Sequence, residues 1–130
     1  MRREYVPPDM SSEAAAEALP AGSHREAATA FVERARSQHG DDLVELYVFG
    51  STVRGEARGR SSDVDILVVL PDAPDRDAIA DSLRDIAYDV MLEHGPLVEL
   101  HILDEATFER HRNEGNPFVH NVLSEGRSYA

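Results

Sequence analysis

Phe49-Gly50-Ser51 and Asp63-Val64-Asp65 decide how this chain folds, because each marks a point where a strand meets polar residues. Residues 43–49 are rich in apolar and β-favouring side chains and predict a strand that ends at Gly50. Residues 64–70 are apolar on both faces beyond Asp65, which is typical of a central strand. The pattern predicts a Gly-Ser turn closing one strand and two carboxylates opening the next.

The remaining elements follow from helical spacing and from residues that end helices. A helix is predicted from Ser23, with Ser23 as N-cap and Glu26 at capping-box spacing, and Gly40 ends it. The other predicted elements are a short helix over 51–56, a helix over 75–94, a strand over 97–103, a helix from Asp104 to about Arg112 and a last helix over 118–124.

This order of elements predicts a single α/β (α+β) domain with a short mixed β-sheet. We expect the helices on one side of the sheet and the site at its open edge. Residues 1–22 have little apolar bulk and are predicted to form a flexible N-terminal arm, and residues 23–130 to form the domain. A length of 130 residues suffices for one compact core.

Composition excludes several classes of function. The chain has 25 acidic and 13 basic residues, and a net charge of -12 opposes general binding to nucleic acid. It has no cysteine, which excludes disulfides, thiolate metal sites and a cysteine nucleophile. No apolar run approaches the ~20 residues of a membrane helix, and no signal-peptide core is present. A cytoplasmic protein without membrane attachment is expected.

Gly50 and Ser51 are candidates for binding phosphate. The first N–H groups of a helix lack partners within it, and the helix dipole favours an anion there. Glycine allows a phosphate to approach the backbone, and the serine hydroxyl adds a donor. Arg54 lies one helical turn further and could add a charged fork to the same phosphates. For an isolated Gly-Ser pair, a tight turn with a capping serine is by far the commoner explanation.

Asp63 and Asp65 are candidates for holding a metal ion. Side chains two residues apart on a strand point to the same face, so the two carboxylates should stand together. Like charges this close repel unless a cation separates them or one takes a proton. Oxygen ligands at the mouth of a sheet suit Mg²⁺, with Mn²⁺ as a second option, and both ions bridge nucleotide phosphates. A solvated turn before a strand is the simpler alternative.

Glu99 is the third candidate acid. Alternation along residues 97–103 places Glu99 and His101 on one face and Val98 on the other. If this strand lies beside the strand of Asp65, Glu99 joins the two aspartates and takes a proton from an attacking hydroxyl or shares the metal. A solvent-facing edge strand is the alternative. Four histidines, His94, His101, His111 and His120, show no convincing metal-ligand spacing, and most of them are interpreted as surface or helix-end residues.

The combination of residues 50–55 with residues 62–65 resembles the signature of the DNA polymerase β-like nucleotidyltransferase superfamily. Within it the chain is similar to the minimal nucleotidyltransferases, over residues 43–103 and a C-terminal segment, 116–126. The resemblance implies that Gly50 and Ser51 bind a nucleotide triphosphate, that Asp63 and Asp65 hold Mg²⁺ and that Glu99 is the third acid. This chain has one more residue between Ser51 and Asp63 than the commonest spacing of the minimal group. Its third acid is glutamate where aspartate is usual.

The resemblance also implies a reaction and a partner. An acceptor hydroxyl would attack the α-phosphorus of ATP and release pyrophosphate. The acceptor would be a tyrosine of a partner HEPN-domain toxin, so that AMPylation makes the chain a type VII-like antitoxin. Two alternatives stay open, namely a catalytically weak antitoxin that neutralises its partner by contact and a small-molecule nucleotidyltransferase resembling aminoglycoside-modifying enzymes. The acceptor, the base preference and any homo-oligomer are left open by the sequence.

Overall fold

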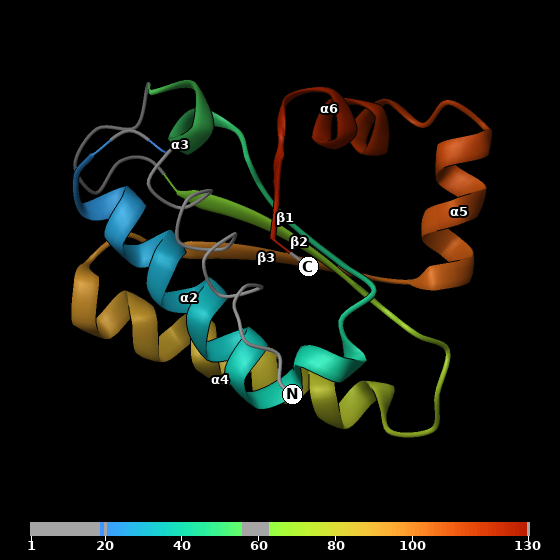
Figure 1. Ribbon diagram of the computed structural model, residues 1–130, viewed down its shortest axis with the longest axis horizontal. Helices are drawn as coiled ribbons and strands as arrows, with labels where there is room; N and C mark the ends of the chain where they lie inside the picture. The colour runs from blue at the N-terminus through green and yellow to red at the C-terminus, as the bar shows by residue number, and fades with distance from the viewer. Residues whose placement is uncertain (1–18, 20, 56–62, 130) are drawn as a thin grey trace, which may run out of the picture.

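A four-stranded mixed sheet forms the centre of the computed structural model, which describes residues 19, 21–55 and 63–129 (Figure 1). The strand order is β3-β2-β1-β4. β1 pairs antiparallel with β2 and β4, whereas β2 and β3 run parallel. The strands are β1 (Glu45–Phe49), β2 (Val64–Leu70), β3 (Val98–Asp104) and β4 (Arg127–Ser128). The predicted mixed sheet in an α/β domain is confirmed.

Helices cover both faces of the sheet, so the expectation that they lie on one side is wrong. α2 (Ser23–His39) and α4 (Arg76–His94) pack together on one face, and α5 (Glu105–Asn113) and α6 (Pro117–Glu125) lie on the other (Figure 1). The reason lies in β2, whose side chains are buried on both faces beyond Asp65. Leu67 and Val69 point away from α4 and pack with Phe108 of α5 and with two valines of α6.

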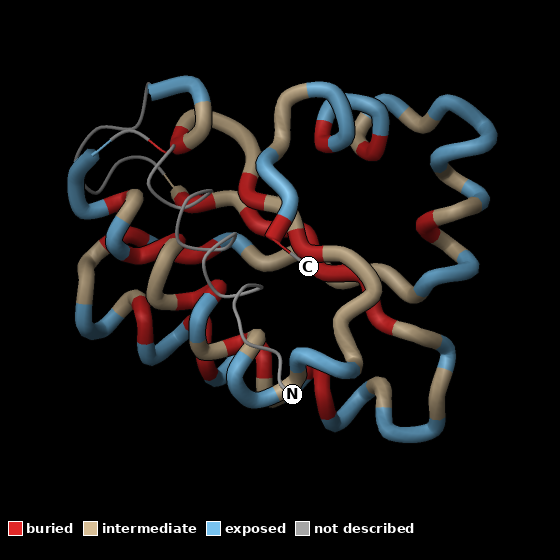
Figure 2. The backbone as a smooth tube through the Cα atoms, viewed as in Figure 1, coloured by how far each residue is buried: buried red, intermediate tan, exposed pale blue. Residues whose placement is uncertain are grey.

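The larger core lies between the sheet and the α2–α4 layer (Figure 2). The predicted apolar stripe of α4 is confirmed, because all five of its members are buried there, namely Ile79, Leu83, Ile86, Ala87 and Val90. Leu19 is buried in the same core. Residues 1–18 and 20 of the predicted arm lie outside the described residues.

Helix ends agree with the sequence in part. The predicted cap at Ser23 is wrong, because Gly22 precedes the helix and the amide of Glu26 donates to the Gly22 carbonyl. Asp104 caps α5 as predicted, accepting from the amide of Thr107, and this bond lowers the pKa of Asp104. Gly40 ends α2 and opens the short 3₁₀ helix η1 (Gly40–Asp42).

The Gly-Ser turn leads into a short helix, α3 (Ser51–Arg54), at the end of β1. Residue 56 of the predicted helix lies outside the described residues. β1 starts at Glu45, two residues later than predicted, although the Val44 amide already donates to the Val69 carbonyl. In the described part of the chain, no helix is both long and apolar enough to cross a membrane.

Candidate active site

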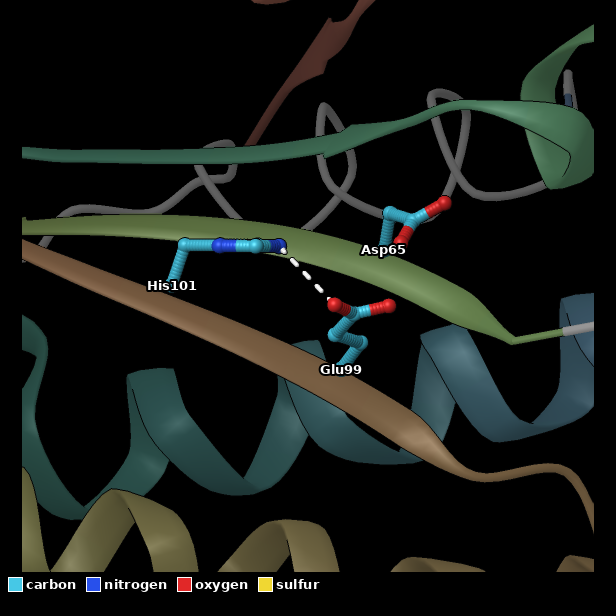
Figure 3. Close-up of side chains that lie close together, drawn as sticks. All are labelled: Asp65, Glu99 and His101. Atoms are coloured by element: carbon cyan, nitrogen blue, oxygen red, sulfur yellow. Dashed lines mark ion pairs between the residues drawn. The ribbon is translucent and has the colours of Figure 1, made fainter. Parts of the chain in front are cut away.

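The site lies at the end of the sheet where β1 finishes and where β2 and β3 begin. Phe49 pairs with Asp65, and Asp65 pairs with Glu99, so the three form one row across the strands. Side chains of one row share a face of the sheet, here the face that α5 and α6 cover further along. The parallel pairing of β2 and β3 therefore brings Asp65 and Glu99 together, as predicted (Figure 3).

Asp65 is the most perturbed acid of the site. Its partial burial, then the charge and a hydrogen bond of Glu99, and then the charge of Asp63, raise the pKa of Asp65 from 3.8 to about 6. Arg54 has a weaker, opposite influence on that pKa. The fold thus holds the Asp65 carboxyl where its ionisation is opposed by burial and by a neighbouring carboxylate, and perturbed acids of this kind are common at functional sites.

His101 completes the cluster, and sequence reasoning missed it. One ligand atom each from Asp65, Glu99 and His101 lie within 4.8 Å of one another. The Nε2 atom of His101 is 3.8 Å from Oε2 of Glu99 (Figure 3). The sequence feature that could have identified His101 is its position two residues after Glu99, which puts both side chains on one face of the strand. Only the register that pairs Leu67 with His101 places the ring beside the acids.

Asp63 stands just before β2 and is not a member of that three-residue group. Its charge still reaches Asp65, whose pKa it helps to raise. The carboxylates of Asp65 and Glu99 supply the hard oxygen donors that Mg²⁺ and Mn²⁺ prefer. Because the two acids are held close and one resists ionisation, a divalent cation fits this donor set. The metal-binding roles of Asp63, Asp65 and Glu99 stay predictions.

Gly50 is required at the turn for two reasons. Its φ of 79° lies in the region that only glycine adopts without strain. In addition, a Cβ added at Gly50 would collide with Oδ2 of Asp65. The turn and the acid therefore lie in direct contact. This contact places Ser51, the first residue of α3, at the same end of the sheet as the carboxylates.

Arg54, the last residue of α3, forms an ion pair with α6. Its Nη1 donates to Oε1 of Glu125 at 2.7 Å, which links α3 to the end of α6. Both side chains are substantially exposed, so the ion pair contributes less than about 1 kcal/mol. The predicted contact of Arg54 with phosphates is not tested by this arrangement.

Thr52 offers a direct test of the packing beneath the turn. Its Oγ1 is buried and has no hydrogen-bond partner among the described residues. A buried hydroxyl without a partner costs roughly 1–3 kcal/mol, so Thr52→Val should raise the free energy of unfolding by about 1 kcal/mol. Urea unfolding measures the change. Thr29→Val, at a partly exposed position of α2, is the matched control and should change it by less than about 0.5 kcal/mol. If Thr52→Val lowers the free energy of unfolding while Thr29→Val does not, the buried hydroxyl is not destabilising and the explanation is wrong.

Comparison with known proteins agrees with this geometry. The family model described as the nucleotidyltransferase domain matches residues 29–127. The match runs from α2 to β4 and includes Gly50, Asp65 and Glu99. The chain belongs to the nucleotidyltransferase domain family, and the predicted superfamily is confirmed.

Two individual proteins are similar to this chain. The first, from Methanocaldococcus jannaschii, is named "Putative protein adenylyltransferase MJ1305" and is 36% identical over 69 residues. The match covers 50% of this chain and 44% of that relative, so the chain spans less than half of its length. The second is a crystal structure of a "putative nucleotidyltransferase" from Sulfolobus solfataricus, 22% identical, with a TM-score of 0.40 over 84% of this chain and 85% of that one.

Proposed function

We propose that this protein transfers AMP from ATP, with a divalent metal, to a tyrosine hydroxyl of a partner HEPN-domain toxin and so acts as its antitoxin. The observation that carries the proposal is the pairing of Asp65 with Glu99 beside the Gly50 turn. Membership of the nucleotidyltransferase domain family supports the reaction class. The name of the M. jannaschii relative supports a protein acceptor in preference to a small molecule.

The residues divide the reaction between them. The first amides of α3, at Ser51 and Thr52, lack partners within the helix and suit the phosphates of the nucleotide. A divalent ion held by Asp65 and Glu99, with Asp63 nearby, would neutralise charge on those phosphates. Position and electrostatics thus supply most of the catalysis, as is general for phosphoryl transfer.

The covalent step is a substitution at the α-phosphorus. The acceptor oxygen forms a bond to that phosphorus, and the bond from phosphorus to the oxygen bridging the α- and β-phosphates breaks. Pyrophosphate leaves with the bond electrons, and AMP stays on the acceptor. Glu99, whose side chain is half exposed, takes the proton of the hydroxyl, since a carboxylate can bind a cation through one oxygen and accept a proton at the other.

Transfer of labelled AMP tests the function. The protein, Mg²⁺ and α-labelled ATP are incubated with a candidate HEPN-domain partner, and label on the HEPN protein is measured. We expect transfer by the wild type and loss in Glu99→Gln. The matched control is Asp85→Asn, an acid on the exposed side of α4, which should transfer normally. A stable complex that never receives AMP would overturn the enzymatic proposal.

Neutralisation by contact alone is the second candidate. It is favoured by the third acid, which is Glu99 in this chain where aspartate is usual in the minimal group. Under this alternative, Glu99→Gln still protects cells from the toxin although it transfers no AMP. Loss of protection with an intact complex would rule it out.

A further inference from the structure

His101 and Glu99 lie close together without a hydrogen bond of good length between them. Their Nε2 and Oε2 atoms are 3.8 Å apart, beyond the roughly 3.2 Å limit of a good N–H···O hydrogen bond. Two ligands of one ion, each bound at about 2.1 Å, lie about 3 Å apart when adjacent and about 4.2 Å apart when opposite. The observed 3.8 Å lies between these two values, so both atoms can contact one cation, and a carboxylate oxygen of Asp65 lies within 4.8 Å of each.

The second reason is that the imidazole is held in place. The ring of His101 lies 5.0 Å from that of Phe118 and 5.8 Å from that of Phe49, measured between centroids. Phe118 comes from α6 and Phe49 from β1, so the ring is held by two other elements and is only 34% exposed. Figure 3 shows its Nε2 edge directed at Glu99, with Asp65 beyond. Little side-chain freedom remains to be lost when an ion binds.

We propose that Nε2 of His101 is a third ligand of the metal ion that Asp65 and Glu99 hold, and that the site therefore binds Mn²⁺ more tightly than Mg²⁺. The inference deepens the proposed function and rests on it only for the presence of a metal. Imidazole nitrogen is a good ligand for transition metals, whereas Mg²⁺ takes oxygen almost exclusively. Two carboxylates and one imidazole form a donor set that Mn²⁺ accepts in full.

Metal binding without nucleotide tests the proposal on the wild-type protein. Free Mn²⁺ is measured by its EPR signal during titration, and Mg²⁺ competes for the same site. Pulsed EPR of the bound Mn²⁺ then reports whether a nitrogen is coordinated. We expect one Mn²⁺ per chain, tighter binding than Mg²⁺ and a nitrogen coupling. Bound Mn²⁺ without that coupling, or equal affinity for both ions, overturns the proposal.

Variants show whether the nitrogen belongs to His101. His101→Phe keeps an aromatic ring against Phe49 and Phe118 but removes both nitrogens. It should lose the nitrogen coupling and bind Mn²⁺ at least about tenfold more weakly. Even residues that only support a metal ligand typically change metal affinity by about 10- to 100-fold when mutated. Mg²⁺ binding should change by less than about twofold, since its ligands are oxygens. His94→Phe, at the end of α4 on the other face of the sheet, is the matched control and should keep both properties.

The outcomes separate this inference from the proposed function. Nitrogen-coupled Mn²⁺ that His101→Phe abolishes, in a protein that transfers no AMP, supports the metal site and overturns the activity. AMP transfer by a protein whose Mn²⁺ shows no nitrogen coupling supports the activity and overturns the role of His101. If His101→Phe retains the coupling, another histidine supplies the nitrogen and the proposal is wrong.

Discussion

Asp65→Asn should abolish AMP transfer and yet stabilise the metal-free protein. The variant removes a carboxylate that we propose to hold the metal, and loss of several kcal/mol of transition-state stabilisation corresponds to a rate loss of at least about 10³-fold. It also removes a negative charge that burial and Glu99 oppose, as the raised pKa of Asp65 indicates. Labelled AMP transfer measures the first effect, and urea unfolding in EDTA measures the second.

The stabilisation by Asp65→Asn should depend on pH in a defined direction. Because the pKa of Asp65 is about 6 in the folded protein and 3.8 otherwise, the folded state holds its proton more tightly. The Asp65 contribution therefore lowers the free energy of unfolding as pH rises from about 4 to about 6. The gain of the variant should be absent near pH 4 and complete above pH 6. Because Asp65 is partly exposed, solvent screening should keep the gain in the free energy of unfolding near 1 kcal/mol.

Two controls make the Asp65 result specific. Asp85→Asn changes an exposed acid on α4 and should show neither the activity loss nor the pH-dependent gain. Saturating Mg²⁺ or Mn²⁺ should reverse the order of stability, because only the wild type retains the full set of oxygen donors. A variant that is less stable than the wild type in EDTA at pH 7 would contradict the electrostatic account of the site.

Gly50→Ala should impair both folding and activity. The new side chain must adopt a φ of 79° and would collide with Oδ2 of Asp65. Left-handed strain costs roughly 1–3 kcal/mol, and the carboxylate at the end of the Asp65 side chain can move aside, so we expect about 1–3 kcal/mol less stability in urea unfolding. Any protein that stays folded should have its Asp65 carboxylate displaced, with at least about 100-fold less transfer, because misplaced reacting groups lose that much.

Gly40→Ala is the matched control for Gly50→Ala. Gly40 has helical dihedral angles, and a Cβ there meets nothing within 4 Å, so its stability should change by less than about 1 kcal/mol. A double-mutant cycle separates strain from collision. In an Asp65→Ala background the collision is gone, and Gly50→Ala should cost less than in the wild type. Equal costs in the two backgrounds would refute the contact between Gly50 and Asp65.

Local signals in the sequence were enough to predict most of the sheet and the helix with the clearest apolar stripe, α4. The stripe of α4 repeats with helical spacing and ends at Gly95, and β2 is a continuous apolar run. The two-sided burial of β2 was also visible, since Leu67 and Val69 are apolar. A strand that is apolar on both faces needs helices on both faces of the sheet. The expectation that helices lie on one side did not take this need into account. β4 has two residues and exists through its pairing with β1, so no local pattern marks it.

The site was predictable to the extent that alternation fixes faces. Glu99 and His101 were placed correctly on one face, but the neighbour of that face depends on strand order and register. Those are set by packing between distant segments, which a single sequence does not display. Asp63 was grouped with Asp65 because residues two apart on a strand point to the same face. Asp63 lies one residue before the strand, which starts at Val64, and its charge still reaches Asp65, so its metal-binding role stays a prediction.

The parallel pair of β2 and β3 has a consequence for how the domain is stabilised. Parallel neighbours require a crossover, and here α4, with its buried apolar face, connects the strands that carry Asp65 and Glu99. Hydrophobic burial beneath that helix thus forces together two charges that repel. The fold is therefore locally frustrated where β2 and β3 begin, and a cation bound there would relieve the repulsion between the two carboxylates.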